Sequence, residues 1–135
     1  MKTDTVIVGA GVMGLAIARE IAKEGHEVVV LEKNPRAGEE TSSRNSGVIH
    51  SGIYYPSGSN KALFCVEGNR LLYEYARARN IGYRNTGKLV VATSSEEVEQ
   101  LEQLQVQGKE NAVEGLELLS KKGVESIQPE IKAEL

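Results

Sequence analysis

Apolar residues near the start of the chain follow two different spacings, and each spacing predicts a different element. Residues 5–11 (TVIVGAG) and 27–33 (EVVVLEK) each contain a continuous run of apolar residues, typical of strands buried on both faces of a parallel sheet. Residues 13–24 instead repeat their apolar positions with a helical period, and Gly25 is placed to end that helix. These segments predict a βαβ unit with a right-handed crossover.

The middle of the chain predicts three more elements. Residues 48–55 are expected to be extended, residues 61–79 have helical spacing, and residues 89–93 (LVVAT) form a further strand. Gly68 lies on the apolar face of the predicted helix, where it allows another backbone to approach closely. The large apolar residues of that face are Phe64, Leu71, Leu72 and Tyr75.

Start signals predict two helices in the last third of the chain. Ser94 and Glu97 match the capping-box pattern, and a shorter helix begins at Ser120 and stops near Pro129. The predicted order is β-α-β-loop-β-α-β-α-α. The fold class is therefore α/β.

Composition narrows the function classes. The chain has 135 residues, 40% of them hydrophobic, which suits one domain. Its net charge of −3 argues against nucleic-acid binding, which usually needs a basic patch. No apolar run approaches the roughly 20 residues that cross a bilayer, so no transmembrane segment is expected. Cys65 is the single cysteine, which excludes an intrachain disulfide and a cysteine metal cluster and fits a cytoplasmic setting.

The segment GAGVMG carries the clearest chemical signal. It is a G-x-G-x-x-G pattern that follows a predicted strand and opens a predicted helix, which is the context of a dinucleotide site. Gly9 permits the tight turn, Gly11 lets a pyrophosphate approach the backbone, and Gly14 lets helix and strand pack closely. Glu32, at the end of the second strand, is placed to accept hydrogen bonds from a ribose. A purely structural turn is the alternative.

The G-x-G-x-x-G pattern, called the glycine fingerprint below, leaves the choice of dinucleotide open. NAD and FAD share it, whereas Glu32 disfavours the 2′-phosphate of NADP, an argument that Lys33 and Arg36 weaken. Residues 41–46 bring four hydroxyls, an amide and a guanidinium together, which suits phosphates and a ribityl chain. Gly47 and Gly52 then bracket VIHSG, where the backbone could lie against a flavin ring. A solvated loop followed by an edge strand explains the same composition.

Three segments resemble one enzyme family over essentially the whole chain. GAGVMGLAIA, ETSSRNSGVIHSGIYYPSGSNKALFCVEGN and GKENAVEGLELL are similar to the N-terminal part of the L-2-hydroxyglutarate dehydrogenases. These belong to the FAD-dependent oxidoreductases related to D-amino-acid oxidase and glycerol-3-phosphate dehydrogenase. The resemblance implies that residues 1–93 are the N-terminal part of an incomplete Rossmann-like FAD-binding domain. Residues 94–135 would be a helical segment that leads into a truncated α+β substrate domain.

The resemblance also implies roles for individual residues around FAD. The adenosine diphosphate half is expected at Gly9, Gly11, Gly14, Glu32 and Lys33. The middle of the cofactor is expected at Thr41, Ser42, Arg44, Asn45 and Ser46, and the flavin ring beside Gly47, Val48 and His50. His50 is the candidate catalytic residue, either as a general base or as a group that positions and tunes the flavin. An ordinary strand histidine is the alternative.

The implied reaction oxidises L-2-hydroxyglutarate, a small 2-hydroxy acid, to 2-oxoglutarate. Hydride passes to the flavin and electrons then pass to a quinone or to oxygen; a quinone acceptor implies peripheral attachment at the inner membrane. The alternatives are an amine oxidase or glycerol-3-phosphate dehydrogenase of the same group, an NAD-dependent dehydrogenase, and a non-catalytic chain. This last alternative arises because the family's C-terminal flavin-binding segment lies outside these residues.

Overall fold

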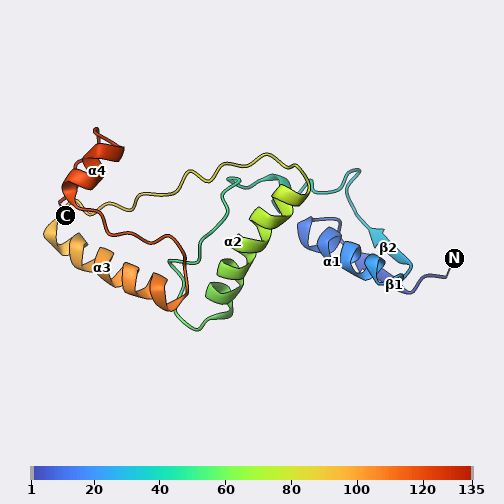
Figure 1. Cartoon of the computed structure of the whole chain (residues 1–135). Coiled ribbons are helices and arrows are strands. Elements are labelled where there is room, and N and C mark those ends of the chain that lie inside the picture. The colour runs from blue at the N-terminus through green and yellow to red at the C-terminus, as the bar shows by residue number, and fades with distance from the viewer. Residues whose placement is uncertain (1, 135) are drawn as a thin grey trace. The chain divides into compact units, whose positions relative to one another are not determined.

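The computed structural model describes residues 2–134, which divide into one compact unit up to Val48 and a second from Ile49. Figure 1 shows the elements of both units. The first unit contains β1 (Thr5–Val8), α1 (Val12–Lys23), β2 (Val28–Leu31) and the short 3₁₀ turn η1 (Thr41–Ser43). The second contains α2 (Asn60–Ala78), α3 (Ser95–Glu110) and α4 (Lys121–Ile127).

The predicted βαβ unit is confirmed. β1 and β2 pair in parallel, with Thr5 opposite Val28 and Val8 opposite Leu31, and α1 connects them and packs against both. α1 ends at Lys23, and Gly25 follows with φ +89°, the left-handed geometry that glycine adopts without steric cost. The α/β fold class is confirmed with it.

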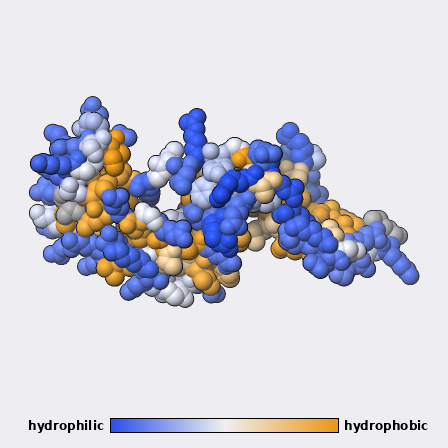
Figure 2. Space-filling model, viewed as in Figure 1, coloured by the Kyte–Doolittle hydropathy of each residue, from blue (hydrophilic) through white to orange (hydrophobic). Residues whose placement is uncertain are grey.

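The prediction that both strands are buried on both faces is wrong. Side chains along β1 alternate between half-buried and exposed, and Val8 is 84% exposed. The reason is that the described sheet has two strands with a helix against one face, so every second side chain points away from that helix. Figure 2 shows apolar surface where Figure 1 places β1 and β2.

The two further predicted strands are also wrong. Residues 51–55 form a turn, in which the Tyr55 N–H donates to the Gly52 carbonyl at 3.3 Å. Residues 89–93 pair with no strand in the described part of the chain, and the Ala92 carbonyl accepts instead from the Glu134 N–H at 2.9 Å. An apolar run becomes a strand only when a neighbouring strand takes its backbone hydrogen bonds, and the local sequence does not encode that neighbour.

The predicted helix starts in the second unit are confirmed. The Ser94 hydroxyl accepts from the Glu97 N–H and the Ser120 hydroxyl from the Gly123 N–H, both at 3.4 Å. Each hydroxyl occupies one of the backbone donors that the first turn of a helix leaves unpaired. No helix among residues 2–134 is both long enough and apolar enough to span a membrane.

Close backbone approach occurs at glycines other than the predicted Gly68. A Cβ added to Gly68 would meet nothing within 4 Å, and Phe64, on the predicted apolar face, is 64% exposed. A Cβ on the buried Gly52 would instead lie 2.9 Å from Cγ2 of Val66 in α2. A Cβ on the buried Gly108 of α3 would lie 3.1 Å from Cγ1 of Ile53. The turn at residues 51–55 therefore packs closely against both helices.

We expect the two helix-interior glycines to respond oppositely to alanine. Gly108→Ala places a methyl group against Leu116 and Ile53, and overpacking of this kind destabilises by about 1–3 kcal/mol. Gly68→Ala meets open space and should stabilise by about 0.5–1 kcal/mol, the usual helix gain. Urea unfolding followed by far-UV circular dichroism measures both. Equal stabilisation by the two variants would contradict the packing described at Gly108.

Candidate functional site

The glycine turn between β1 and α1 has a conformation that requires glycine at two positions. Gly9 has φ +101°, and its N–H donates to the Leu31 carbonyl at 2.7 Å. A Cβ on Gly14 would overlap the carbonyl oxygen of Gly9. These glycines allow α1 to start directly beside the end of β1, which leaves the first N–H groups of α1 facing outward from the turn.

Glu32 ties this turn to the end of β2. One carboxylate oxygen accepts from the Ala10 N–H at 2.7 Å and the other from the Asn34 N–H at 2.9 Å. The backbone N–H groups of Asn34 and then Ala10, followed by weaker contributions from Lys33, lower the pKa of Glu32. A carboxylate has about four lone-pair positions, so two remain for the hydroxyls of a ribose. The geometry fits the predicted adenosine contact, which stays a prediction.

The polar loop returns to the same place through η1. The Ser42 hydroxyl accepts from the N–H of Val12, the first residue of α1, at 2.9 Å. A Cβ on Gly11 would lie 3.2 Å from that hydroxyl. The structure thus brings together the two segments that the sequence assigned separately to phosphates. A helix N-terminus offers N–H groups and a partial positive charge to an anion, and Ser42 adds a hydroxyl there.

The other predicted residues of the loop differ in whether their side chains form hydrogen bonds within the protein. Asn45 stabilises its own turn, since its Nδ2 donates to the Ser42 carbonyl at 2.8 Å and its Oδ1 accepts from the Gly47 N–H at 2.8 Å. Gly47 has φ +67°. Exposed side chains without a side-chain hydrogen bond in the described structure are those of Thr41, Arg44, Ser46 and Val48. These four remain available to a ligand.

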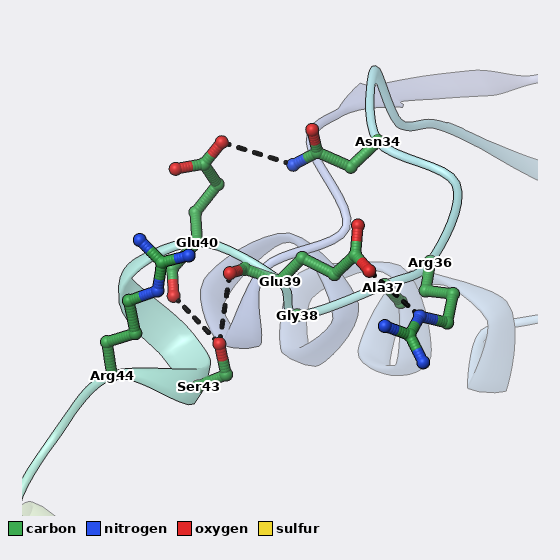
Figure 3. Close-up of a pocket in the computed structure, with 8 residues that line it drawn as sticks. All are labelled: Asn34, Arg36, Ala37, Gly38, Glu39, Glu40, Ser43 and Arg44. Carbon is green, nitrogen blue, oxygen red and sulfur yellow. Dashed lines mark hydrogen bonds and ion pairs between the residues drawn. The ribbon is translucent and has the colours of Figure 1, made fainter.

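A polar hollow of about 600 Å³ lies beside the loop, and Figure 3 shows its lining residues. Arg36 Nε pairs with a carboxylate oxygen of Glu39 at 2.8 Å. Glu40 accepts from Asn34 at 3.2 Å and pairs with Lys33 at 3.0 Å, and these two partners lower the pKa of Glu40. The lining holds two arginines and two glutamates, so it carries no excess positive charge for an additional phosphate. This favours a ligand with a free ribose at Glu32 over NADP.

His50 belongs to the second unit and is exposed. Its Nδ1 lies 3.1 Å from the Tyr55 hydroxyl, and the two rings are stacked at 11° with centroids 6.5 Å apart. Gly52 packs on α2, because its missing side chain makes room for Val66. The approach of the backbone around Gly47 and Gly52 to a flavin ring stays a prediction. His50 is therefore part of a hydrogen-bonded pair on a turn and is not a strand histidine.

Sequence reasoning missed the side chains that hold this turn. Amides of Asn69, Gln107 and Asn111 donate to four of its backbone carbonyls, as detailed below. Gln107 and Asn111 are four residues apart, a spacing that places them on one helix face. That spacing could have shown that the two amides share a helix face. It could not have identified the turn they contact, which is more than 50 residues away in sequence.

Comparison with known proteins gives a consistent picture. The family model described as FAD dependent oxidoreductase matches residues 4–135. L-2-hydroxyglutarate dehydrogenase, mitochondrial, from Arabidopsis thaliana is 46% identical over 131 residues, covering 97% of this chain and 27% of the relative. The protein of the same name from Dictyostelium discoideum is 47% identical over 135 residues, covering 98% and 30%. The chain therefore spans less than a third of these curated relatives.

One solved structure is also similar. Dithionite-reduced L-alpha-glycerophosphate oxidase from Mycoplasma pneumoniae, with FAD bound, superposes with a TM-score of 0.74 at 32% identity. The similarity covers 96% of this chain and 35% of that one.

Ser42→Ala should destabilise the start of α1. It removes the only side-chain acceptor that the structure gives the Val12 N–H, and loss of such a cap costs about 1 kcal/mol. Hydrogen exchange at the amides of the first turn of α1 measures the effect. Ser46→Ala, in the same loop but without a side-chain hydrogen bond in the described structure, is the control. Unchanged exchange in Ser42→Ala would contradict the contact.

Glu32 should make stability depend on acidic pH. Its pKa is lowered in the folded chain, so its contribution is complete above the unfolded pKa of about 4.3 and disappears as pH falls through the folded value. Glu32→Gln should therefore lose less stability than the parent between neutral and acidic pH. Urea midpoints across that range measure this, with the exposed Glu24→Gln as control. Identical pH profiles for the parent and Glu32→Gln would refute the assignment.

Proposed function

Because the chain belongs to the FAD-dependent oxidoreductase family, we propose that it holds FAD at the glycine turn and polar loop and takes part in oxidising L-2-hydroxyglutarate to 2-oxoglutarate. The observation that carries the cofactor site is the Ser42 hydroxyl on the Val12 N–H. It brings the phosphate-binding end of α1 and a hydroxyl-rich loop to one point. The substrate follows from the names of the similar dehydrogenases.

The residues present fit FAD as a ligand. The N-terminus of α1 and Ser42 would hold the pyrophosphate, and Glu32 would hold the adenosine ribose with the carboxylate positions that Ala10 and Asn34 leave open. Thr41, Arg44 and Ser46 expose a hydroxyl or a guanidinium that suits the phosphates and the ribityl chain. FAD, when bound, supplies the hydride acceptor, while the protein supplies orientation and electrostatics.

His50 is the residue of this chain that we propose beside the substrate. Nδ1 is engaged with Tyr55, so Nε2 is the ring nitrogen left to contact a substrate oxygen. Electrons would leave through a quinone or oxygen. A quinone acceptor would place the protein peripherally at the inner membrane, and oxygen would allow a cytoplasmic location.

A second candidate substrate is L-glycerol 3-phosphate. The solved oxidase that is 32% identical over 96% of this chain is named for that substrate. It uses the same cofactor, so FAD binding alone does not separate the two candidates.

FAD binding is tested first by titration of the purified chain, followed by flavin fluorescence. We expect saturable binding, and Gly14→Ala should weaken it about tenfold or more, because its methyl group overlaps the Gly9 carbonyl and forces the turn open. Gly82→Ala, at a glycine with open space around it, is the matched control. Binding of NAD in place of FAD would overturn the proposal.

The substrate is tested by adding candidates to the FAD-loaded chain without oxygen. Loss of the flavin absorbance band with L-2-hydroxyglutarate, but not with its D-enantiomer, is the expected result. Bleaching by L-glycerol 3-phosphate would favour the second candidate, and bleaching by glycine would favour an amine oxidase. A chain that binds FAD but is bleached by none of them would refute a catalytic role for this chain.

A further inference from the structure

Three side-chain amides hold the turn at residues 51–55 together with His50 just before it, so that the held segment is residues 50–55. Asn69 of α2 donates to the His50 carbonyl at 3.0 Å, and Gln107 of α3 donates to the Ile53 carbonyl at 2.8 Å. Asn111, the residue that ends α3, donates to two carbonyls, those of Gly52 at 3.1 Å and Tyr55 at 2.8 Å. We call Asn69, Gln107 and Asn111 the amide clamp.

The amide clamp binds both ends of the segment, where the side chains of His50 and Tyr55 are attached. Asn69 fixes the backbone of His50, and Asn111 fixes the backbone of Tyr55. With both backbones fixed, the two side chains meet at 3.1 Å in a stacked arrangement. Lys61 Nζ lies 4.3 Å from the centre of the Tyr55 ring and holds that ring from its face.

Chemistry decides which group donates in the pair. A phenol O–H is a stronger donor than a neutral imidazole N–H, and a bare imidazole nitrogen is a stronger acceptor than a phenol oxygen. The Lys61 cation over the ring withdraws electron density from the phenol and strengthens its O–H as a donor. The favoured bond therefore runs from the Tyr55 O–H to Nδ1 of His50, which leaves the proton of the neutral ring on Nε2.

We propose that Tyr55 and the amide clamp are positioning residues that hold His50 with an N–H at Nε2, so that His50 serves as a hydrogen-bond donor to a substrate oxygen. This rests on the proposed function for the substrate, a 2-hydroxy acid, whose carboxylate and hydroxyl oxygens both accept. With its proton on Nε2, a neutral His50 does not act as a general base, because the nitrogen that Tyr55 leaves unengaged already carries a proton. The sequence suggested a general base or a group that positions and tunes the flavin, and the pair with Tyr55 argues against the general base.

Nitrogen-15 NMR of the histidine rings in the chain without cofactor tests this directly. At about pH 8.5, two units above the ordinary histidine pKa of about 6.5, ring nitrogens distinguish protonated from bare positions. We expect a bare Nδ1 whose resonance shifts when Tyr55→Phe removes its donor. His26, the chain's other histidine, is an internal reference that should not shift. A proton on Nδ1, or no shift in Tyr55→Phe, would overturn the proposal.

The role of the clamp is tested by Asn111→Asp, which keeps the shape of the side chain but removes both donors. The Nδ1 resonance should move toward its position in Tyr55→Phe, and in the Tyr55→Phe background Asn111→Asp should add nothing. Gln103→Glu, at an exposed amide in α3 about two turns before Asn111, is the matched control and should leave the resonance in place.

A folded Asn111→Asp chain with an unmoved His50 resonance would show that the clamp is merely structural and would sink this part of the inference. If Asn111→Asp does not fold, Asn69→Ala replaces it, because alanine suits the interior of α2 and removes only the bond to the His50 carbonyl. We expect the His50 Nδ1 resonance to shift in Asn69→Ala as well, and an unmoved resonance in that variant would decide against the clamp. None of these NMR measurements uses FAD or substrate. The clamp proposal can therefore fail while the chain binds FAD, and FAD binding can fail while the clamp proposal holds.

Discussion

The backbone N–H groups at the start of α1 are the constraint on which the first unit depends. A helix leaves its first N–H groups without partners inside the helix, and here they follow a glycine turn that keeps side chains away. Ser42 accepts from the N–H of Val12, the first of these groups, and Glu32 accepts from the N–H of Ala10 in the turn just before the helix. The end of β2 and the polar loop therefore both contact this point. A phosphate group placed at the remaining N–H groups of the first turn of α1 would lie close to the glycine turn and the polar loop, the segments that the family resemblance assigns to phosphates.

In the second unit, the backbone groups that need partners are carbonyls. Its turn at residues 50–55 leaves backbone carbonyls without a strand partner, and side-chain amides from α2 and α3 donate to them. In the first unit side-chain oxygens accept from backbone donors, whereas in the second side-chain nitrogens donate to backbone acceptors. In both units side chains fix a turn or loop that carries groups assigned to cofactor or substrate, which is a common arrangement for functional loops.

Local signals predicted most of the elements, and non-local contacts account for the errors. The glycine fingerprint, the Ser94 and Ser120 starts and the helical periods act within one or two turns. As a result β1, α1, β2, α2 and α4 were predicted close to their observed bounds, and α3 was predicted at its start. The strands expected at residues 48–55 and 89–93 depended on partners that sequence does not reveal.

The candidate site divides in the same way. The sequence identified Gly14 and Glu32 because their roles follow from local spacing around one turn. It grouped Ser42 with the cofactor only by composition and resemblance, and the bond to Val12, 30 residues away, required the fold. Asn111 was missed entirely, because its importance comes from carbonyls more than 50 residues earlier in the chain.

The most direct test of the central claim is amide NMR of the nitrogen-15-labelled chain during titration with FAD and, separately, with riboflavin, which lacks the phosphates and the adenosine. If the glycine turn and the polar loop bind one pyrophosphate, FAD will shift the amide signals of Gly11, Val12 and residues 42–46, and riboflavin will not. Saturable FAD binding that leaves these signals in place would contradict the account.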